Sequence, residues 1–126
     1  MIQLLKDIQQ SVQEPQYVLI HKDHTHVYPL PGGAPYHTKS KSAAELILKV
    51  AEKDLGQMDY YVCELKQALV HISMKQAQLE REWAPAIKQI RNAKDLDERF
   101  AVYKKARKMG PHPVLFDNEL KFLLNI

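Results

Sequence analysis

The sequence predicts a mainly helical α+β protein, in which a small N-terminal β-hairpin precedes a long helical hairpin or coiled-coil-like bundle. Three observations support this class. Apolar residues recur at alternating spacings of four and three from Met58 to Ile90, two short runs near the N-terminus are rich in β-branched and aromatic residues, and a proline- and glycine-rich segment follows these runs. We expect one domain over residues 1–126, with a helix, hairpin and loop in residues 1–37 and a helical bundle in residues 38–126.

Composition and charge exclude several classes of protein. The 126 residues are 45% hydrophobic and 26% charged, which excludes a disordered chain. Eighteen basic and fifteen acidic residues give a net charge of +3, too small to indicate nucleic-acid binding by itself. Cys63 is the only cysteine, so no disulfide can form within the chain, and we expect a reducing, cytoplasmic location. No stretch approaches about 18 consecutive apolar residues, so no membrane association is expected.

Short elements alternate with breaks in the N-terminal part. Residues 1–13 place their apolar side chains on one stripe of a short helix, and Pro15 ends it. Strands are predicted at residues 17–21 and 25–28, because the three residues between them have the length of a hairpin loop. The edges of this hairpin could pair with another chain. Residues 29–35 hold three prolines and two glycines, which excludes a regular element there.

Helix signals dominate the middle of the chain. A capping box that begins at Ser42 predicts a helix to about Leu55, with Gly56 as its stop. The alternating apolar spacing then predicts a long helix over residues 59–84, which Pro85 kinks or restarts. The apolar seam of so long a helix should meet another helix, either in this chain or in a second copy.

The last third of the chain is predicted to add one more helix and an apolar tail. A second capping box, formed by Asp95 and Glu98, predicts a helix that ends at Gly110. Residues 114–126 are apolar enough to dock on the bundle, and periodicity leaves open whether they form a helix or a strand. Gln76 interrupts the apolar seam, and a polar residue at such a position can fix the register and number of helices.

Histidines cluster at the predicted hairpin turn, where His21, His24 and His26 occur within six residues of one another. Two imidazoles and a carboxylate can hold a zinc ion and leave a position for water, so His24, His26 and Asp23 are candidate metal ligands. The alternative is a polar turn whose histidines are solvated or hydrogen-bonded. No cofactor and no enzymatic activity are expected, because no catalytic motif occurs in the sequence.

Positive charge concentrates near the C-terminus, where residues 99–126 carry six basic and two acidic residues. Five of the basic residues fall on the expected last long helix and could face nucleic-acid phosphates. They are Arg99, Lys104, Lys105, Arg107 and Lys108. The alternative is that these cations complement the helix dipole and keep the protein soluble.

The leading functional expectation is a small, non-enzymatic protein-interaction module, that is, an adaptor, inhibitor or assembly factor. It would bind another protein and could form a homo-oligomer through the apolar seam. The expected partner-binding residues are hairpin side chains and one tryptophan, namely Tyr17, His21, His26, Tyr28 and Trp83. The alternatives are a nucleic-acid-binding accessory protein and, less favoured, a metal-dependent hydrolase at the histidine cluster. A phage or mobile-element origin is a further expectation that rests on no particular residue.

Overall fold

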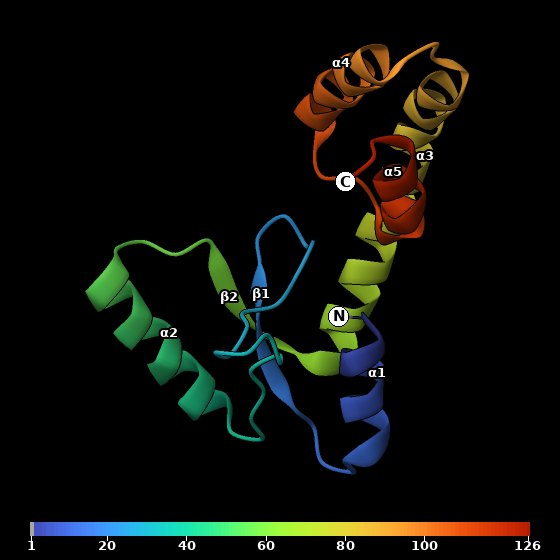
Figure 1. The fold of residues 1–126 in the computed structure, drawn as a ribbon. Helices are drawn as coiled ribbons and strands as arrows, with labels where there is room; N and C mark the ends of the chain where they lie inside the picture. Colours follow the sequence, from blue (N-terminus) through green and yellow to red (C-terminus); the bar gives the residue numbers. More distant parts are fainter. Residues whose placement is uncertain (1) are drawn as a thin grey trace. The chain divides into compact units, whose positions relative to one another are not determined.

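The computed structural model describes residues 2–126, which form two compact units (Figure 1). The first unit spans Met1–Lys75 and the second Gln76–Ile126, so the boundary falls inside the longest helix. The proline- and glycine-rich loop at residues 29–35 lies within the first unit. The predicted fold class is confirmed, because the chain is mostly helical with one small two-stranded antiparallel sheet.

The first unit combines two helices and the sheet with the beginning of a third helix. Its elements are α1 (Ile2–Ser11), β1 (Tyr17–His21), α2 (Lys41–Leu55), β2 (Tyr60–Glu64) and the start of α3 (Leu65–Asn92). The helix α1 ends shortly before Pro15, and α2 ends at Gly56, whose φ of 84° lies in the region that favours glycine. The side chain that caps α2 is Ser40, two residues before the predicted cap.

The sheet is where the structure departs most from the sequence prediction. Residues 60–64 form β2, so the long helix begins at Leu65 and not at Asp59. The segment 25–28, expected to be the second strand, forms only a single bridge with β1, between Ile20 and Val27. The strand β1 therefore lies in the middle, because β2 covers one edge and the segment 25–28 covers part of the other.

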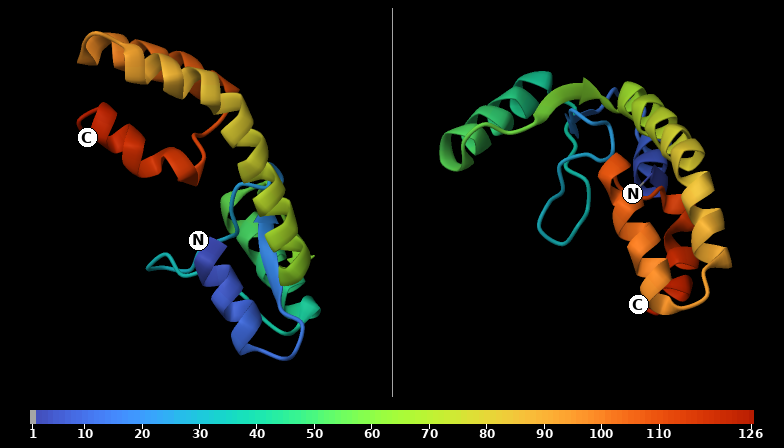
Figure 2. Two further views of the ribbon diagram at one scale, coloured as in Figure 1. Left: turned by 90° about the vertical axis from the view of Figure 1, so that its right-hand side faces the viewer. Right: turned by 90° about the horizontal axis from the view of Figure 1, so that it is seen from above.

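The core of the first unit lies between the sheet, α1 and α3. Its buried side chains are Leu5, Val18, Ile20, Val27, Cys63, Leu65, Ala68 and Ile72. Leu19 is also fully buried, although its side chain points to the opposite face of β1 from Val18 and Ile20. On that opposite face α2 packs against both strands (Figures 1 and 2). The middle of β1 is consequently apolar at every position, as expected for a strand covered on both faces.

The second unit contains three helical segments and two short 3₁₀ turns. After the end of α3 come α4 (Leu96–Ala106), turns at Arg107–Met109 and Val114–Phe116, and α5 (Asp117–Leu123). The predicted cap is confirmed, because the Asp95 carboxylate accepts the amide of Glu98 at 2.8 Å. The open question about the tail is answered by α5, which is a helix. The core of this unit consists of Trp83, Ala86, Ile87, Ile90, Ala106, Leu120 and Leu124.

The apolar seam of α3 is buried within the chain. In the first unit Leu65 and Ile72 belong to the core that α1 and the sheet complete. In the second unit Trp83 and Ile90 belong to the core that α4 and α5 complete. These residues are therefore covered without a second copy of the chain. Gln76, the polar residue in the seam, accepts the backbone N–H of Val114 at 3.1 Å through its side-chain oxygen.

Pro85 lies inside α3, which continues to Asn92, so this proline does not end the helix. Within residues 2–126, no helix is both long enough and apolar enough to cross a membrane.

Candidate functional site

A cluster of histidine and tyrosine side chains lies at one end of the sheet in the first unit. The strand β1 ends at His21, and β2 begins at Tyr60 directly opposite it. The turn after β1 is closed by a hydrogen bond from the amide of His24 to the carbonyl of His21, and His24 has a positive φ of 62°. Strand pairing therefore brings Tyr60 and Tyr61 next to the histidines of this turn.

His21, Asp23 and His26 converge on one another, and we call them the His21–Asp23–His26 group. Nδ1 of His21 lies 2.8 Å from Oδ1 of Asp23. The hydroxyl of Thr25 donates to the same carboxylate oxygen at 2.6 Å and lies 2.8 Å from Nδ1 of His26. The imidazole rings of His21 and His26 stack with their centroids 4.8 Å apart. One nitrogen or oxygen atom from each member lies within 4.8 Å of the other two.

Tyr60 supports this group from β2. Its hydroxyl lies 2.8 Å from Nε2 of His26, and its ring meets His21 edge-on at a centroid distance of 5.1 Å. The ring of Tyr28 also meets the Tyr60 ring edge-on, at a centroid distance of 5.5 Å. Burial raises the pKa of the Tyr60 hydroxyl, and the negative charge of Asp23 acts in the same direction. Tyr60 is therefore a neutral hydrogen-bonding partner at physiological pH.

The environment also sets the charge states within the group. Burial lowers the pKa of His26, the positive charge of a protonated His21 acts in the same direction, and Asp23 opposes both. For Asp23, burial raises the pKa, but hydrogen bonds from Thr25 and His21 outweigh it, and the pKa lies below its ordinary value. At physiological pH, the imidazole of His26 is therefore neutral and the carboxylate of Asp23 is ionised.

His24 lies outside this group, which corrects the ligand set His24, His26 and Asp23 predicted from the sequence. Its Nε2 lies 2.8 Å from the hydroxyl of Tyr61, and its ring stacks on His71 of α3 at a centroid distance of 4.4 Å. The left-handed backbone at His24 breaks the strand alternation on which the prediction relied. His21 takes the place of His24 beside Asp23 and His26.

The five expected partner-binding residues differ in exposure. Tyr17, His21, His26 and Tyr28 are half-buried in the first unit, and Tyr17 also forms a bridge with Thr38. Trp83 is fully buried in the core of the second unit, so it packs that core and offers no surface to a partner. This is a correction, and its cause is that the apolar seam is covered by α4 and α5.

Of the five residues in the expected basic surface, one is not exposed. Arg99 is half-buried and donates from Nη1 to the carbonyl of Leu123 at 3.0 Å, so it ties α4 to the end of α5. The other four side chains, Lys104, Lys105, Arg107 and Lys108, are exposed.

The helix α2 has apolar side chains on two sides. Ala44, Leu48 and Ala51 are turned toward the sheet and are buried or half-buried. On the other side Leu46, Ile47 and Val50 are 61%, 38% and 50% exposed. We call these three residues the outward face of α2. Their spacing of one and three residues places them on a single stripe of the helix.

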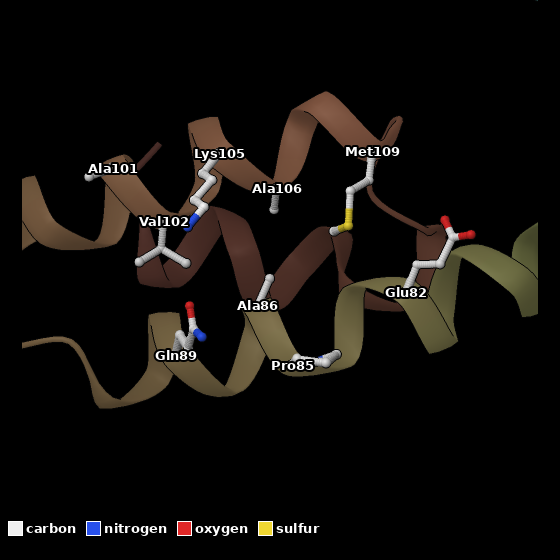
Figure 3. Close-up of a pocket in the computed structure, with 9 residues that line it drawn as sticks. All are labelled: Glu82, Pro85, Ala86, Gln89, Ala101, Val102, Lys105, Ala106 and Met109. Atoms are coloured by element: carbon white, nitrogen blue, oxygen red, sulfur yellow. The ribbon is translucent and has the colours of Figure 1, made fainter.

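A groove of about 550 Å³ lies between α3 and α4 in the second unit (Figure 3). Figure 3 shows Val102 and Ala106 of α4 across from Gln89 and Ala86 of α3. The remaining residues that line it are Glu82, Pro85, Ala101, Lys105 and Met109.

Comparison with known protein families, curated proteins and solved structures gave no match. The interpretation of the site consequently rests on the geometry of this chain.

The sequence prediction did not place Tyr60 and Tyr61 beside the histidines, because residues 59–84 were predicted to form one helix. Both tyrosines instead lie on β2, which pairs with β1. The adjacent tyrosines were an available signal, because aromatic and β-branched residues are enriched in strands. The run from Tyr60 to Val62 carries that signal over three consecutive positions.

Proposed function

We propose that the protein is a non-enzymatic protein-interaction module that binds another protein through the outward face of α2. The observation that carries this proposal is the second apolar side of α2, which the rest of the first unit leaves uncovered. Single exposed apolar residues are common on protein surfaces, but contiguous apolar patches mark interaction sites. A helix with apolar residues on two sides is typical of one that is covered on both.

The charges beside the outward face indicate the chemistry of the partner. Lys49 and Lys53 lie four residues apart on α2, and Glu45 lies four residues before Lys49. Neither lysine forms an ion pair with any residue in the described range 2–126. A partner helix with an apolar stripe flanked by acidic side chains would cover the outward face and neutralise both lysines.

Cys63 supports a reducing, cytoplasmic location as part of this proposal. Its thiol is free and buried, and burial raises its pKa, so the side chain packs as a small apolar group.

The proposal is tested by affinity capture from the source cells with matched variants. The double variant Leu46→Ser and Ile47→Ser should lose a partner that the unaltered protein retains in near-stoichiometric amount. The control is Val70→Ser with Met74→Ser, which changes two exposed apolar residues of α3 in the same unit and should retain the partner. Equal retention by both double variants would contradict the proposal.

Charge-reversal variants and a measurement of mass in solution distinguish a partner protein from a second copy of the chain on the outward face of α2. Lys49→Glu with Lys53→Glu should release the partner, whereas the lysine-to-arginine pair should retain it. The protein alone should be monomeric by light scattering at about 0.1 M and about 0.5 M salt. A dimer that the Leu46→Ser and Ile47→Ser variant dissociates would instead assign the outward face to a second copy.

Nucleic-acid binding is the alternative function, and the four exposed cations Lys104, Lys105, Arg107 and Lys108 favour it. Each cation that contacts a phosphate of duplex DNA should contribute about 0.9 to the slope of log affinity against log salt. Replacing one lysine by alanine should therefore reduce that slope by about the same amount. Absence of binding to duplex DNA and to RNA at low salt would remove this alternative.

A further inference from the structure

We propose that His21, Asp23 and His26 bind a divalent transition-metal ion of the zinc type, with Nδ1 of each histidine and one oxygen of Asp23 as ligands. One ring nitrogen of each histidine and one oxygen of Asp23 lie within 4.8 Å of one another, at the end of β1 and in the turn that follows it. Tetrahedral ligands at zinc bond lengths of about 2.0–2.2 Å lie about 3.3–3.6 Å apart, so the ligand atoms must move closer by up to about 1.5 Å. Rotations of three partly exposed side chains can provide this movement.

The hydrogen bonds identify which atoms face the ion. Nε2 of His26 is occupied by the hydroxyl of Tyr60, which leaves Nδ1 on the side of Thr25 and Asp23. Nδ1 of His21 lies 2.8 Å from Oδ1 of Asp23 and 3.2 Å from the backbone nitrogen of Asp23, which donates to it. A metal ion would bind Nδ1 and Oδ1 together, since imidazole ligands bind metals through an unprotonated nitrogen.

Tyr60 allows His26 to change its protonated nitrogen without losing a hydrogen bond. In the metal-free arrangement, Nδ1–H of His26 donates to Thr25, the Thr25 hydroxyl donates to Asp23, and the Tyr60 hydroxyl donates to Nε2. When a metal occupies Nδ1, the ring proton must be on Nε2, and the hydroxyl of Tyr60 can accept it. A second hydrogen bond of this kind is what orients metal-binding histidines in known sites.

The donor set selects the class of ion. Two imidazoles and one carboxylate suit zinc and its transition-metal neighbours, whereas magnesium and calcium prefer oxygen ligands. Three protein ligands leave at least one position for water or for a group from another molecule. The Asp23 side chain is exposed, so the ion can enter directly from solvent.

The test uses the full chain without a histidine tag, stripped of metal with a chelator and titrated with ZnCl₂ in a calorimeter. One ion per chain should bind. Tyr60→Phe removes only the supporting hydroxyl and should lower the zinc affinity by about 10–100-fold. His21→Ala and Asp23→Asn each remove a ligand and should lower the affinity more. The controls His37→Ala and His112→Ala remove histidines outside the group and should leave the affinity unchanged. Circular dichroism shows whether each variant is folded.

Two spectroscopic measurements separate this site from adventitious binding. Titration with CoCl₂ should give the intense visible absorption of a tetrahedral ion, and His21→Ala should abolish it. Nitrogen-15 NMR should show the ring proton of His26 moving from Nδ1 to Nε2 when Zn²⁺ is added. The proposal is overturned if no ion binds, or if binding persists unchanged in His21→Ala and Asp23→Asn. Because the outward face of α2 is a separate surface, Leu46→Ser with Ile47→Ser should bind zinc normally.

Discussion

The largest fully buried side chain, Trp83, packs against Tyr103 and His112, with ring centroids 5.6 Å and 6.0 Å away. Its indole Nε1 has no hydrogen-bond partner among residues 2–126. A buried, unpaired N–H costs about 1–3 kcal/mol, so part of the stabilisation from burying this ring is lost. The apolar area of the side chain, and not its polar group, is therefore what holds the second unit together.

Two substitutions at Trp83 should separate these contributions. Trp83→Ala should lower the free energy of unfolding by about 3–5 kcal/mol, because it leaves a large cavity. Trp83→Phe should lower the free energy of unfolding clearly less, since it keeps most of the aromatic side chain and removes the unpaired N–H. Urea unfolding followed by circular dichroism measures both, with the exposed residue change Met74→Ala as a control expected within about 0.5 kcal/mol. Equal losses in the two Trp83 variants would contradict this account.

At the scale of single residues, the candidate site was only partly predictable. His21, Asp23 and His26 lie within six positions, so their proximity is visible in the sequence. The choice between His21 and His24 depended on the positive φ of His24, which few non-glycine residues adopt. Tyr60 reaches the site through strand pairing across almost forty residues, which local spacing does not reveal.

The start of α4 depends on one capping side chain. The Asp95 carboxylate accepts the amide of Glu98, and the Glu98 carboxylate accepts the amide of Lys94 at 3.1 Å. Asp95→Ala should lower the free energy of unfolding by about 1 kcal/mol, because an amide at the helix end loses its acceptor. Asp95→Asn is the matched control and should retain most of that stability, since asparagine caps equally well. Thermal unfolding by circular dichroism compares them, and equal losses would refute the capping role.

Among the elements, those delimited by local chemistry were predicted well and those delimited by distant pairing were not. Pro15, Gly56 and Asp95 act on their own neighbours, so the ends that they mark are readable in the sequence. The segment 60–64 also fits the spacing of a helix seam, through Met58, Val62 and Leu65. Its strand state depends on pairing with β1, a partner that the periodicity of one segment does not identify.

At the scale of the whole molecule, two paired carboxyl groups should make the second unit sensitive to acid. Hydrogen bonds from His112 and then Lys121 lower the pKa of Asp117 below its ordinary 3.8. A hydrogen bond from Arg91 lowers the pKa of Glu119 below its ordinary 4.5, with two nitrogens of Arg91 on its two carboxylate oxygens. Because both folded-state values are depressed, these groups stabilise the unit fully above about pH 4.5 and lose that contribution as the pH falls through the lowered values.

Melting temperatures between pH 7 and pH 3 should therefore fall less in Asp117→Asn with Glu119→Gln than in the unaltered protein. The control pair Asp97→Asn with Glu80→Gln changes two carboxyl groups that form no ion pair or side-chain hydrogen bond within the described residues. This pair should preserve the original pH dependence. An unchanged acid transition in the first pair would show that other groups control it.

Because each unit has its own core, we expect a substitution in one core to destabilise that unit more than the other. Ile72 belongs to the first core and Ile90 to the second, and both are almost fully buried on the one helix that the units share. Each change to alanine should lower the free energy of unfolding by about 2–5 kcal/mol. Native-state hydrogen exchange should show that Ile90→Ala lowers protection in α4 and α5 while β1 and β2 keep theirs, and Ile72→Ala should do the reverse. The double variant should combine the two losses within about 0.5 kcal/mol, since the residues share no core neighbours. If either change lowered protection equally throughout the chain, the two units would be a single cooperative structure and each core would depend on the other.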